Sequence, residues 1–262
     1  MAFFQMNYHS DAVGMGVTVN VVLPESAKTL IGMQADGGNG IFRTLYLLHG
    51  LSDDHSIWER RTSVERYAAD YGIAVVMPTV GRSWYTDTAY GQKYFTFVSK
   101  ELPSVCRSFF CGMSEKREDN FVAGLSMGGY GAVKTALSCP ESFGGFASFS
   151  GALDIANRPG ELSPEWKGIF GFDLKNHTDI AGTKNDLFFL ASEFEKTGYS
   201  FPKGYIWCGT GDRLLGQNRR FYDHLTSLGY SVQYEESEGD HSWKWWDLRV
   251  RDAMRLFFGK GE

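Results

Sequence analysis

Long apolar runs, clustered basic residues and paired cysteines are all scarce in this chain of 262 residues. No segment approaches the roughly 20 apolar residues of a membrane-spanning helix. The net charge is −5, which argues against nucleic acid or an anionic membrane surface as partner, because both favour clustered Lys and Arg. The N-terminus, from Met1 to His9, has neither a basic segment nor a sustained apolar one. We therefore expect no signal peptide.

The cysteines give no sign of a disulfide framework or of a metal site. There are four of them, at Cys106, Cys111, Cys139 and Cys208, and none forms a CxxC pair. Without a secretion signal, the expectation is reduced thiols in a cytoplasmic protein. No cluster of residues has metal-ligand spacing, so we expect no metal.

Short apolar runs recur along the chain and predict strands that are buried on both faces. The runs lie at residues 17–23, 44–48, 73–77, 121–125, 145–149, 205–208 and 232–234. Helical patterns between them lie at residues 57–71, 94–110, 127–137, 219–228 and 243–258. This alternation predicts an α/β fold, with a mostly parallel central sheet and helices on both faces. At this length we expect a single domain over residues 1–262.

Residues 152–200 interrupt the alternation of strands and helices. The segment is too long for a simple connection, and it mixes Pro, Gly, aromatic and charged residues. Loops of this length inside a compact domain are usually functional. We expect a lid-like insertion that carries short helices over the carboxyl edge of the sheet.

A G-x-S-x-G pattern, Gly124 to Gly128, lies where an apolar run leads directly into a helical pattern. The pattern alone is weak evidence in a chain with 31 glycines, but a strand–turn–helix context makes it specific. The glycines permit a tight turn. That turn would lift Ser126 above the sheet, near a helix N-terminus whose partial positive charge favours a developing anion. We therefore expect Ser126 to be a nucleophile.

A serine hydroxyl is a poor nucleophile unless a base takes its proton. Of the six histidines, only His241 lies beyond Ser126 and directly after a late strand. An acid must orient that base, and Asp212 lies in a loop at the end of an earlier strand. The chain order of serine, acid and histidine is that of the α/β-hydrolase fold. The less favoured candidates for the acid are Asp173, Asp186 and Asp240.

Two backbone N–H groups should stabilise the oxyanion that forms during acyl transfer. Their expected positions are Met127, directly after the nucleophile, and Leu51, after His49-Gly50 in an earlier loop. We expect His49 to shape that loop rather than to transfer a proton. Several aromatic residues at the same edge together indicate an apolar substrate pocket: Trp58, Trp84, Tyr85 and Trp243.

These motifs together resemble the esterase D-like family of α/β-hydrolases, and within it the bacterial tributyrin esterases. The resemblance implies a serine carboxylesterase that hydrolyses short-chain acyl esters through an acyl-enzyme intermediate and without a cofactor. It also implies Ser126, Asp212 and His241 as the triad. Relatives of this kind are often oligomeric, so by analogy we expect a homo-oligomer. The residues that carry the resemblance are 47–51, 84–87, 124–131, 148–151 and the loops of Asp212 and His241.

The sequence is also compatible with other functions. S-formylglutathione hydrolases usually have His at the position of Tyr130 and Cys near Ser52-Asp53, so this chain departs from the pattern of that thioesterase. The aromatic-rich edge is compatible with a feruloyl or acetylxylan esterase that acts on plant oligosaccharides. Acyl transfer to an acceptor other than water, and peptide hydrolysis, are not excluded. A non-catalytic binding module on the same scaffold is the alternative from another class, and the complete triad argues against it.

Overall fold

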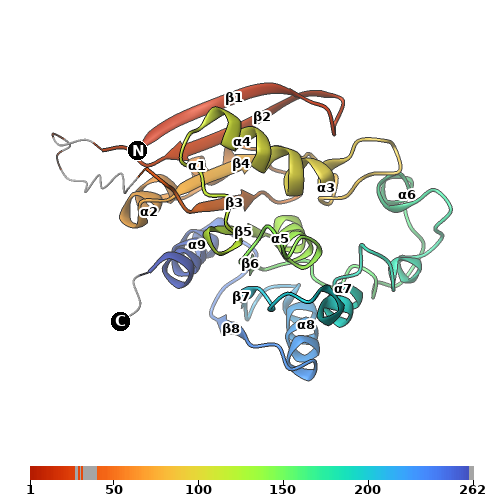
Figure 1. Cartoon of the computed structure of the whole chain (residues 1–262). Helices are drawn as coiled ribbons and strands as arrows, with labels where there is room; N and C mark the ends of the chain where they lie inside the picture. The colour runs from red at the N-terminus through yellow and green to blue at the C-terminus, as the bar shows by residue number, and fades with distance from the viewer. Residues whose placement is uncertain (27–28, 30, 32–39, 260–262) are drawn as a thin grey trace.

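The computed structural model describes residues 1–26, 29, 31 and 40–259 (Figure 1). Its centre is an eight-stranded sheet with the order β1-β2-β4-β3-β5-β6-β7-β8. The pairs β1–β2 and β2–β4 are antiparallel, and the other neighbours in the sheet are parallel. The predicted α/β-hydrolase architecture, with its mostly parallel central sheet, is therefore confirmed.

Each predicted apolar run forms a strand. The strands are β2 (Met15–Leu23), β3 (Thr44–Leu48), β4 (Ala74–Pro78), β5 (Asn120–Leu125), β6 (Gly145–Phe149), β7 (Lys203–Gly209) and β8 (Val232–Ser237). The sequence did not predict β1 (Ala2–Ser10). This strand lies at the edge of the sheet and most of its side chains are exposed or half-buried. It therefore lacks the continuous apolar run that marks a buried strand.

Two predicted helices are interrupted. Residues 57–71 form α1 (Ile57–Arg61) and α2 (Val64–Tyr71), and the chain is extended at Thr62, with φ −137° and ψ 174°. The other interruption is a π-helical turn, η1 (Phe97–Glu101), between α3 (Tyr94–Thr96) and α4 (Leu102–Phe109). Pro103, the second residue of α4, has no N–H for the helical ladder.

The remaining long helices form where they were predicted, except that the one predicted at residues 219–228 begins at Leu215. They are α5 (Met127–Ser138), α8 (Leu215–Ser227) and α9 (Trp243–Phe258). Together the helices cover both faces of the sheet. Leu48 and Val122 pack on the side of α4, α5 and α8, whereas Leu47 and Ala123 pack on the side of α1, α2 and α9. Figure 1 shows α5 and α9 on opposite sides of β5 and β6. None of the described helices has the length and apolar character needed to cross a bilayer.

Residues 152–200 contain four short helices. They are α6 (Pro164–Phe170), η3 (His177–Ile180), α7 (Leu187–Glu193) and η4 (Phe194–Thr197). Backbone hydrogen bonds tie α6 to the loop that follows β4: the Ala89 N–H donates to the Ile169 carbonyl (3.2 Å) and the Tyr90 N–H to the Gly168 carbonyl (3.0 Å). The segment is thus docked on another loop of the protein and does not hang free.

Candidate active site

Ser126 occupies a strained turn between β5 and α5. Its backbone angles are φ 53° and ψ −115°, and a residue other than glycine adopts a positive φ only at an energetic cost. Hydrogen bonds hold the turn. The Ser126 N–H donates to the Phe149 carbonyl (3.0 Å), and the Ser126 carbonyl accepts from the N–H groups of Tyr130 (3.2 Å) and Ala152 (3.1 Å). The strand–turn–helix context that gives G-x-S-x-G its meaning is therefore present.

The two glycines of the pattern have no room for a side chain. A Cβ atom on Gly124 would lie 2.4 Å from the Gly128 carbonyl oxygen. A Cβ atom on Gly128 would lie 2.4 Å from the carbonyl oxygen of Leu48, on β3. Both clashes are with backbone, which cannot move aside as the end of a side chain can. The close approach of α5 to β3 thus requires glycine at both positions.

His241 lies between Asp212 and Ser126. Its Nδ1 atom is 2.8 Å from Asp212 Oδ2, and its Nε2 atom is 3.1 Å from Ser126 Oγ. An ionised carboxylate only accepts hydrogen bonds, so we assign the ring proton to Nδ1 and leave Nε2 free to accept from the serine hydroxyl. The structure thus brings the three predicted residues together from the loops that follow β5, β7 and β8.

Asp212 is held as a carboxylate. Its side chain is fully buried, and Oδ1 accepts a hydrogen bond from the Leu214 N–H (2.8 Å). Burial raises the pKa of Asp212, but hydrogen bonds from His241, the Ser150 side chain and the Leu214 N–H outweigh it and leave the pKa below its usual 3.8. The group that orients His241 is therefore charged at neutral pH.

Two of the less favoured candidates for the acid, Asp240 and Asp186, form hydrogen bonds with other groups. Asp240 accepts a hydrogen bond from the Ser242 hydroxyl. Asp186 accepts from the backbone N–H groups of Phe188 (3.0 Å) and Gly182 (2.9 Å), at the start of α7. Asp186 is thus a helix cap, and the ring of His241 is paired with Asp212 alone of the three.

Ser150 supports the site and was not predicted from the sequence. It has a positive φ of 49°. Its N–H donates to the Trp207 carbonyl (2.8 Å), and its Oγ accepts from the Trp246 indole (3.2 Å). Because its side chain also bonds to Asp212, Ser150 links the acid to α9. The only signal in the sequence was the segment 148–151, which carried the resemblance but no role.

The two predicted oxyanion donors flank Ser126. Met127 is the first residue of α5, and the first N–H groups of a helix have no partner within it. Leu51 follows Gly50 in the loop after β3. A Cβ atom on Gly50 would lie 2.8 Å from Leu125 Cδ1 and 3.9 Å from Ser126 Cβ, so this loop passes directly beside the serine.

Two of the four aromatic residues predicted to line a pocket lie in the core instead. Trp58 is fully buried, and its indole N–H donates to the Leu48 carbonyl (3.1 Å). Tyr85 is fully buried, and its hydroxyl donates to the His49 carbonyl (2.9 Å). Both side chains anchor the end of β3 and present no surface to a substrate. Their positions beside predicted loops gave no sign of these hydrogen bonds.

The other two aromatic residues keep some exposed surface. Trp84 is 7% exposed and packs against Trp166 of the insertion, with ring centroids 4.8 Å apart and the ring planes tilted by 49°. Trp243 is half-buried and packs edge-on against Trp246, with centroids 5.3 Å apart. Trp246 in turn packs edge-on against the His241 ring, at 4.9 Å. Trp84 and Trp243 therefore remain candidates for substrate contact.

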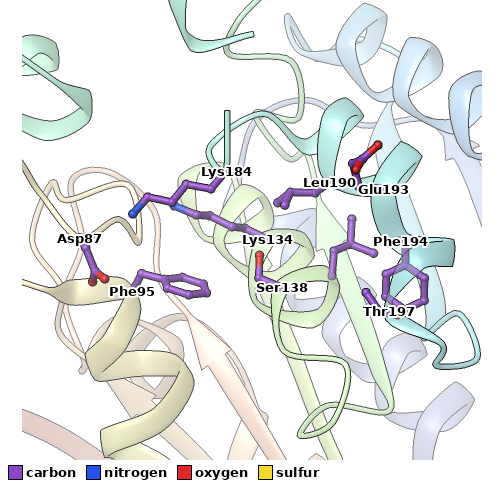
Figure 2. A pocket seen from close by; sticks show the side chains of 10 residues that line it. Asp87, Phe95, Lys134, Ser138, Lys184, Leu190, Glu193, Phe194 and Thr197 are labelled. Atoms are coloured by element: carbon purple, nitrogen blue, oxygen red, sulfur yellow. The ribbon is translucent and has the colours of Figure 1, made fainter. Parts of the chain in front are cut away.

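The cavity in Figure 2 lies away from the triad. It has a volume of about 360 Å³, and α3, the C-terminal half of α5, α7 and η4 surround it. None of the described residues that line it belongs to the triad or to the predicted oxyanion loop. The residues that give it an apolar character are Phe95, Leu137, Leu190 and Phe194.

Lys134 is buried in the wall of this cavity. Its ammonium donates to the Tyr85 carbonyl (3.1 Å), Thr86 Oγ1 (2.7 Å) and Asn185 Oδ1 (2.8 Å). No described carboxylate lies within ion-pair distance of it, and burial lowers the pKa of Lys134 to about 7. Lys134 therefore connects α5 to the Tyr85 loop and to the insertion.

Comparisons with known proteins agree with this geometry. A family model described as putative esterase matches residues 10–192. An acetyl esterase from Caldicellulosiruptor saccharolyticus is 32% identical over 264 residues, and the match covers 97% of each chain. The solved structure of fluorophosphonate-binding serine hydrolase F from Staphylococcus aureus, with substrate bound, is similar with a TM-score of 0.87, 33% identity and 99% coverage of each chain.

A second solved structure is similar over the same length. S-formylglutathione hydrolase from Staphylococcus aureus, as apoenzyme, has a TM-score of 0.84 and 34% identity, and 98% of each chain is covered. The family model spans more than half of the present chain, and the acetyl esterase spans nearly all of it. The chain therefore belongs to this esterase family, and it is a serine carboxylesterase with the α/β-hydrolase fold.

Proposed function

We propose that Ser126, His241 and Asp212 are the catalytic triad of this esterase, and that its substrates are esters of short acyl chains. The observation that carries the proposal is the continuous line of two hydrogen bonds, Ser126 Oγ to His241 Nε2 at 3.1 Å and His241 Nδ1 to Asp212 Oδ2 at 2.8 Å. A base within hydrogen-bond reach of the nucleophile, oriented by an acid, is the arrangement that activates a serine.

Acylation follows from these distances. His241 Nε2 takes the Ser126 proton while Oγ forms a bond to the ester carbonyl carbon. The carbonyl oxygen becomes an oxyanion, which accepts hydrogen bonds from the N–H groups of Leu51 and Met127. When the intermediate collapses, the bond to the alkoxy oxygen breaks and His241 donates its proton to the departing alcohol. The acyl group remains on Ser126 as an ester.

Deacylation repeats the sequence with water as the nucleophile. His241 takes a proton from the water as its oxygen attacks the acyl carbon, and the same N–H groups stabilise the second oxyanion. Collapse returns the proton to Ser126 Oγ and releases the carboxylic acid. Asp212 stays ionised throughout and stabilises the imidazolium that forms in each half of the reaction.

The preference for short acyl chains is proposed from two observations. A relative 32% identical over nearly the whole chain is described as an acetyl esterase. Trp84 and Trp166 are in contact, so an aromatic wall joins the Tyr85 loop to residues 152–200. We propose that this segment acts as a lid that sets acyl preference, and that tributyrin and related esters of the esterase D-like family are substrates.

Thioester hydrolysis is the second candidate, because an S-formylglutathione hydrolase is 34% identical to this chain. The residues at two positions favour oxygen esters. Ser52-Asp53 stands where such hydrolases usually have a cysteine. Tyr130 stands where they usually have histidine, and its hydroxyl donates to the Asn185 carbonyl (2.8 Å) in the core. We therefore propose a carboxylesterase and place formylglutathione among the control substrates.

We also propose a cytoplasmic location and a homo-oligomeric assembly. The four cysteines are unpaired, as a reducing, cytoplasmic compartment would keep them. Phe4 on the edge strand and Phe109 on α4 are both exposed, and apolar surface of this kind favours association of copies. Sedimentation velocity would distinguish a homo-oligomer from a monomer.

The triad is tested by two substitutions assayed on acetyl, butyryl and feruloyl esters, with formylglutathione and a peptide as controls. Ser126→Ala should lower kcat by about 10⁶-fold. Asp212→Asn should lower it by about 10⁴-fold, because the amide favours the wrong imidazole tautomer. Asp186→Asn is the matched control and should leave kcat close to wild type. The proposal would be contradicted if purified Ser126→Ala protein kept a tenth of the activity. It would also be contradicted if Asp186→Asn were inactive while Asp212→Asn remained active.

A further inference from the structure

The loop that carries Leu51 begins with a buried histidine that the triad does not use. We propose that His49 is a positioning residue, and that its ring fixes the direction of the Leu51 N–H toward the oxyanion. The inference rests on the proposed role of that N–H in the oxyanion hole. It assigns to His49 no contact with substrate and no proton transfer.

The tautomer of His49 follows from its two hydrogen bonds. Nε2 lies 3.0 Å from the Val80 nitrogen, and the Val80 N–H can only donate. Nε2 must therefore carry a lone pair, and the ring proton must be on Nδ1. Nδ1 lies 2.6 Å from the Gly50 carbonyl oxygen, so it donates to that oxygen. Burial also favours the neutral ring and lowers the pKa of His49 to about 4.

The Gly50 carbonyl accepts a short bond from the His49 ring and a longer one from the Asp53 N–H (3.3 Å), and its direction determines where the next N–H points. The Gly50 carbonyl and the Leu51 N–H belong to one planar peptide group, and in a trans peptide they point in opposite directions. When the His49 ring holds the carbonyl, it therefore turns the Leu51 N–H away from itself. Gly50 packs against Ser126 and Leu125 on the side where its own side chain would be. The N–H is thus directed before any substrate arrives.

A second bond holds the preceding peptide. The hydroxyl of fully buried Tyr85 donates to the His49 carbonyl at 2.9 Å. Tyr85 has a strained backbone, with φ 48°, and its own carbonyl is held by Lys134 at 3.1 Å. Carbonyl groups at two successive positions, 49 and 50, are therefore fixed by side chains. Donors fixed in advance stabilise an oxyanion without the cost of reorganisation.

Two substitutions separate the two bonds of the ring. The amide of asparagine lies close to the place of Nδ1, so His49→Asn keeps a donor for the Gly50 carbonyl and loses the acceptor for Val80. The amide of glutamine lies close to the place of Nε2, so His49→Gln keeps the acceptor for Val80 and loses the donor. Thermal unfolding of both variants gives the structural cost of each change, and steady-state kinetics on a butyryl ester give kcat and KM.

We expect His49→Gln to lower kcat by about 10²-fold, with KM nearly unchanged. This loss lies at the lower end of the roughly 10²–10³-fold loss that is typical of a missing oxyanion donor. His49→Asn should keep kcat within about 10-fold of wild type at a similar loss of stability. Equal losses of kcat in the two variants, or a larger loss in His49→Asn, would overturn the inference. The wild-type protein gives a test that does not depend on folding of the variants: ¹⁵N NMR of the ring should show the proton on Nδ1, and a proton on Nε2 would refute the argument.

These outcomes are distinct from those that test the triad. If Ser126→Ala remained active, the proposed function would fail whatever the His49 variants did. If Ser126 is essential but His49→Gln retains its kcat, only the positioning role fails. A fluorophosphonate links the two, because its phosphonyl oxygen occupies the oxyanion hole after reaction with serine. The Leu51 amide proton should shift downfield on labelling of wild type and shift less in His49→Gln. Equal shifts would contradict the inference.

Discussion

Replacing Lys134 by methionine should change the free energy of unfolding by an amount that depends on pH. The pKa of Lys134 falls from its usual 10.5 to about 7 because burial disfavours the ammonium. Below pH 7 the lysine is charged in both the folded and the unfolded state, so the folded state carries the full cost of the buried charge. Between pH 7 and pH 10.5 the unfolded chain binds more protons, so wild-type stability gains a contribution that grows as the pH rises.

The size of this contribution follows from the difference between the two pKa values. The difference is about 3.5, and each pH unit is worth about 1.4 kcal/mol, so the contribution is at most about 5 kcal/mol. Methionine does not titrate. The lost hydrogen bonds to Tyr85, Thr86 and Asn185 add a cost for Lys134→Met that varies little with pH. The stability difference between wild type and Lys134→Met should therefore increase above pH 7, by about 1 kcal/mol per unit or slightly more.

Urea unfolding of both proteins between pH 6 and pH 9 measures this difference, and other titrating groups cancel in it. Lys184→Met is the matched control, because Lys184 lines the same cavity (Figure 2) but is exposed. Its stability difference from wild type should vary much less with pH, because the charge of Lys184 makes only a small contribution to the lowered pKa of Lys134 and burial makes the largest. Parallel curves for wild type and Lys134→Met over this range would refute the reasoning, since Lys134 would then not change its charge there on folding.

Two further predictions concern the turn and the insertion. Gly128→Ala should destabilise the protein by about 1–3 kcal/mol or more, because the new Cβ would lie 2.4 Å from the Leu48 carbonyl oxygen. Thermal unfolding measures the loss, and Gly216→Ala is the control because its Cβ would meet nothing closer than 3.6 Å. Equal stability of the Gly128→Ala and Gly216→Ala proteins would contradict the prediction. Trp166→Ala should change the ranking of kcat/KM among acetyl, butyryl and aryl esters, because the Trp166 ring packs against Trp84 with the ring centroids 4.8 Å apart. An equal loss of kcat/KM on every ester would instead indicate a purely structural role for Trp166.

The sequence predicted the parts of the fold that depend on local pattern. Continuous apolar runs marked the seven strands from β2 to β8, because a strand covered on both faces must be apolar on both. The break between α1 and α2 was not predictable in this way. There the Ser63 N–H donates to Asp247 Oδ1 (3.0 Å), a partner 184 residues away. Only the folded chain brings these groups together.

In the candidate site, too, some features could be predicted from the sequence and others depend on contacts between distant segments. Ser126, Asp212 and His241 were predictable because chain order and position after strands fix where they meet. Ser150 and Lys134 were not, since their partners come from distant segments. The burial of Trp58 and Tyr85 was also hidden, because it depends on hydrogen bonds to carbonyls at the end of β3. An aromatic residue beside an active-site loop has the same sequence signature whether it faces substrate or anchors the loop.

Labelling with a fluorophosphonate tests the central claim most directly. The protein is titrated with the reagent, residual butyrate ester hydrolysis is measured, and the modified residue is located by peptide mass spectrometry. One phosphonyl group per chain should appear on Ser126 in proportion to the activity lost, and Ser126→Ala protein should take up none. Inactivation with the label on another residue, or complete labelling of Ser126 with activity retained, would contradict the assignment of Ser126 as the nucleophile.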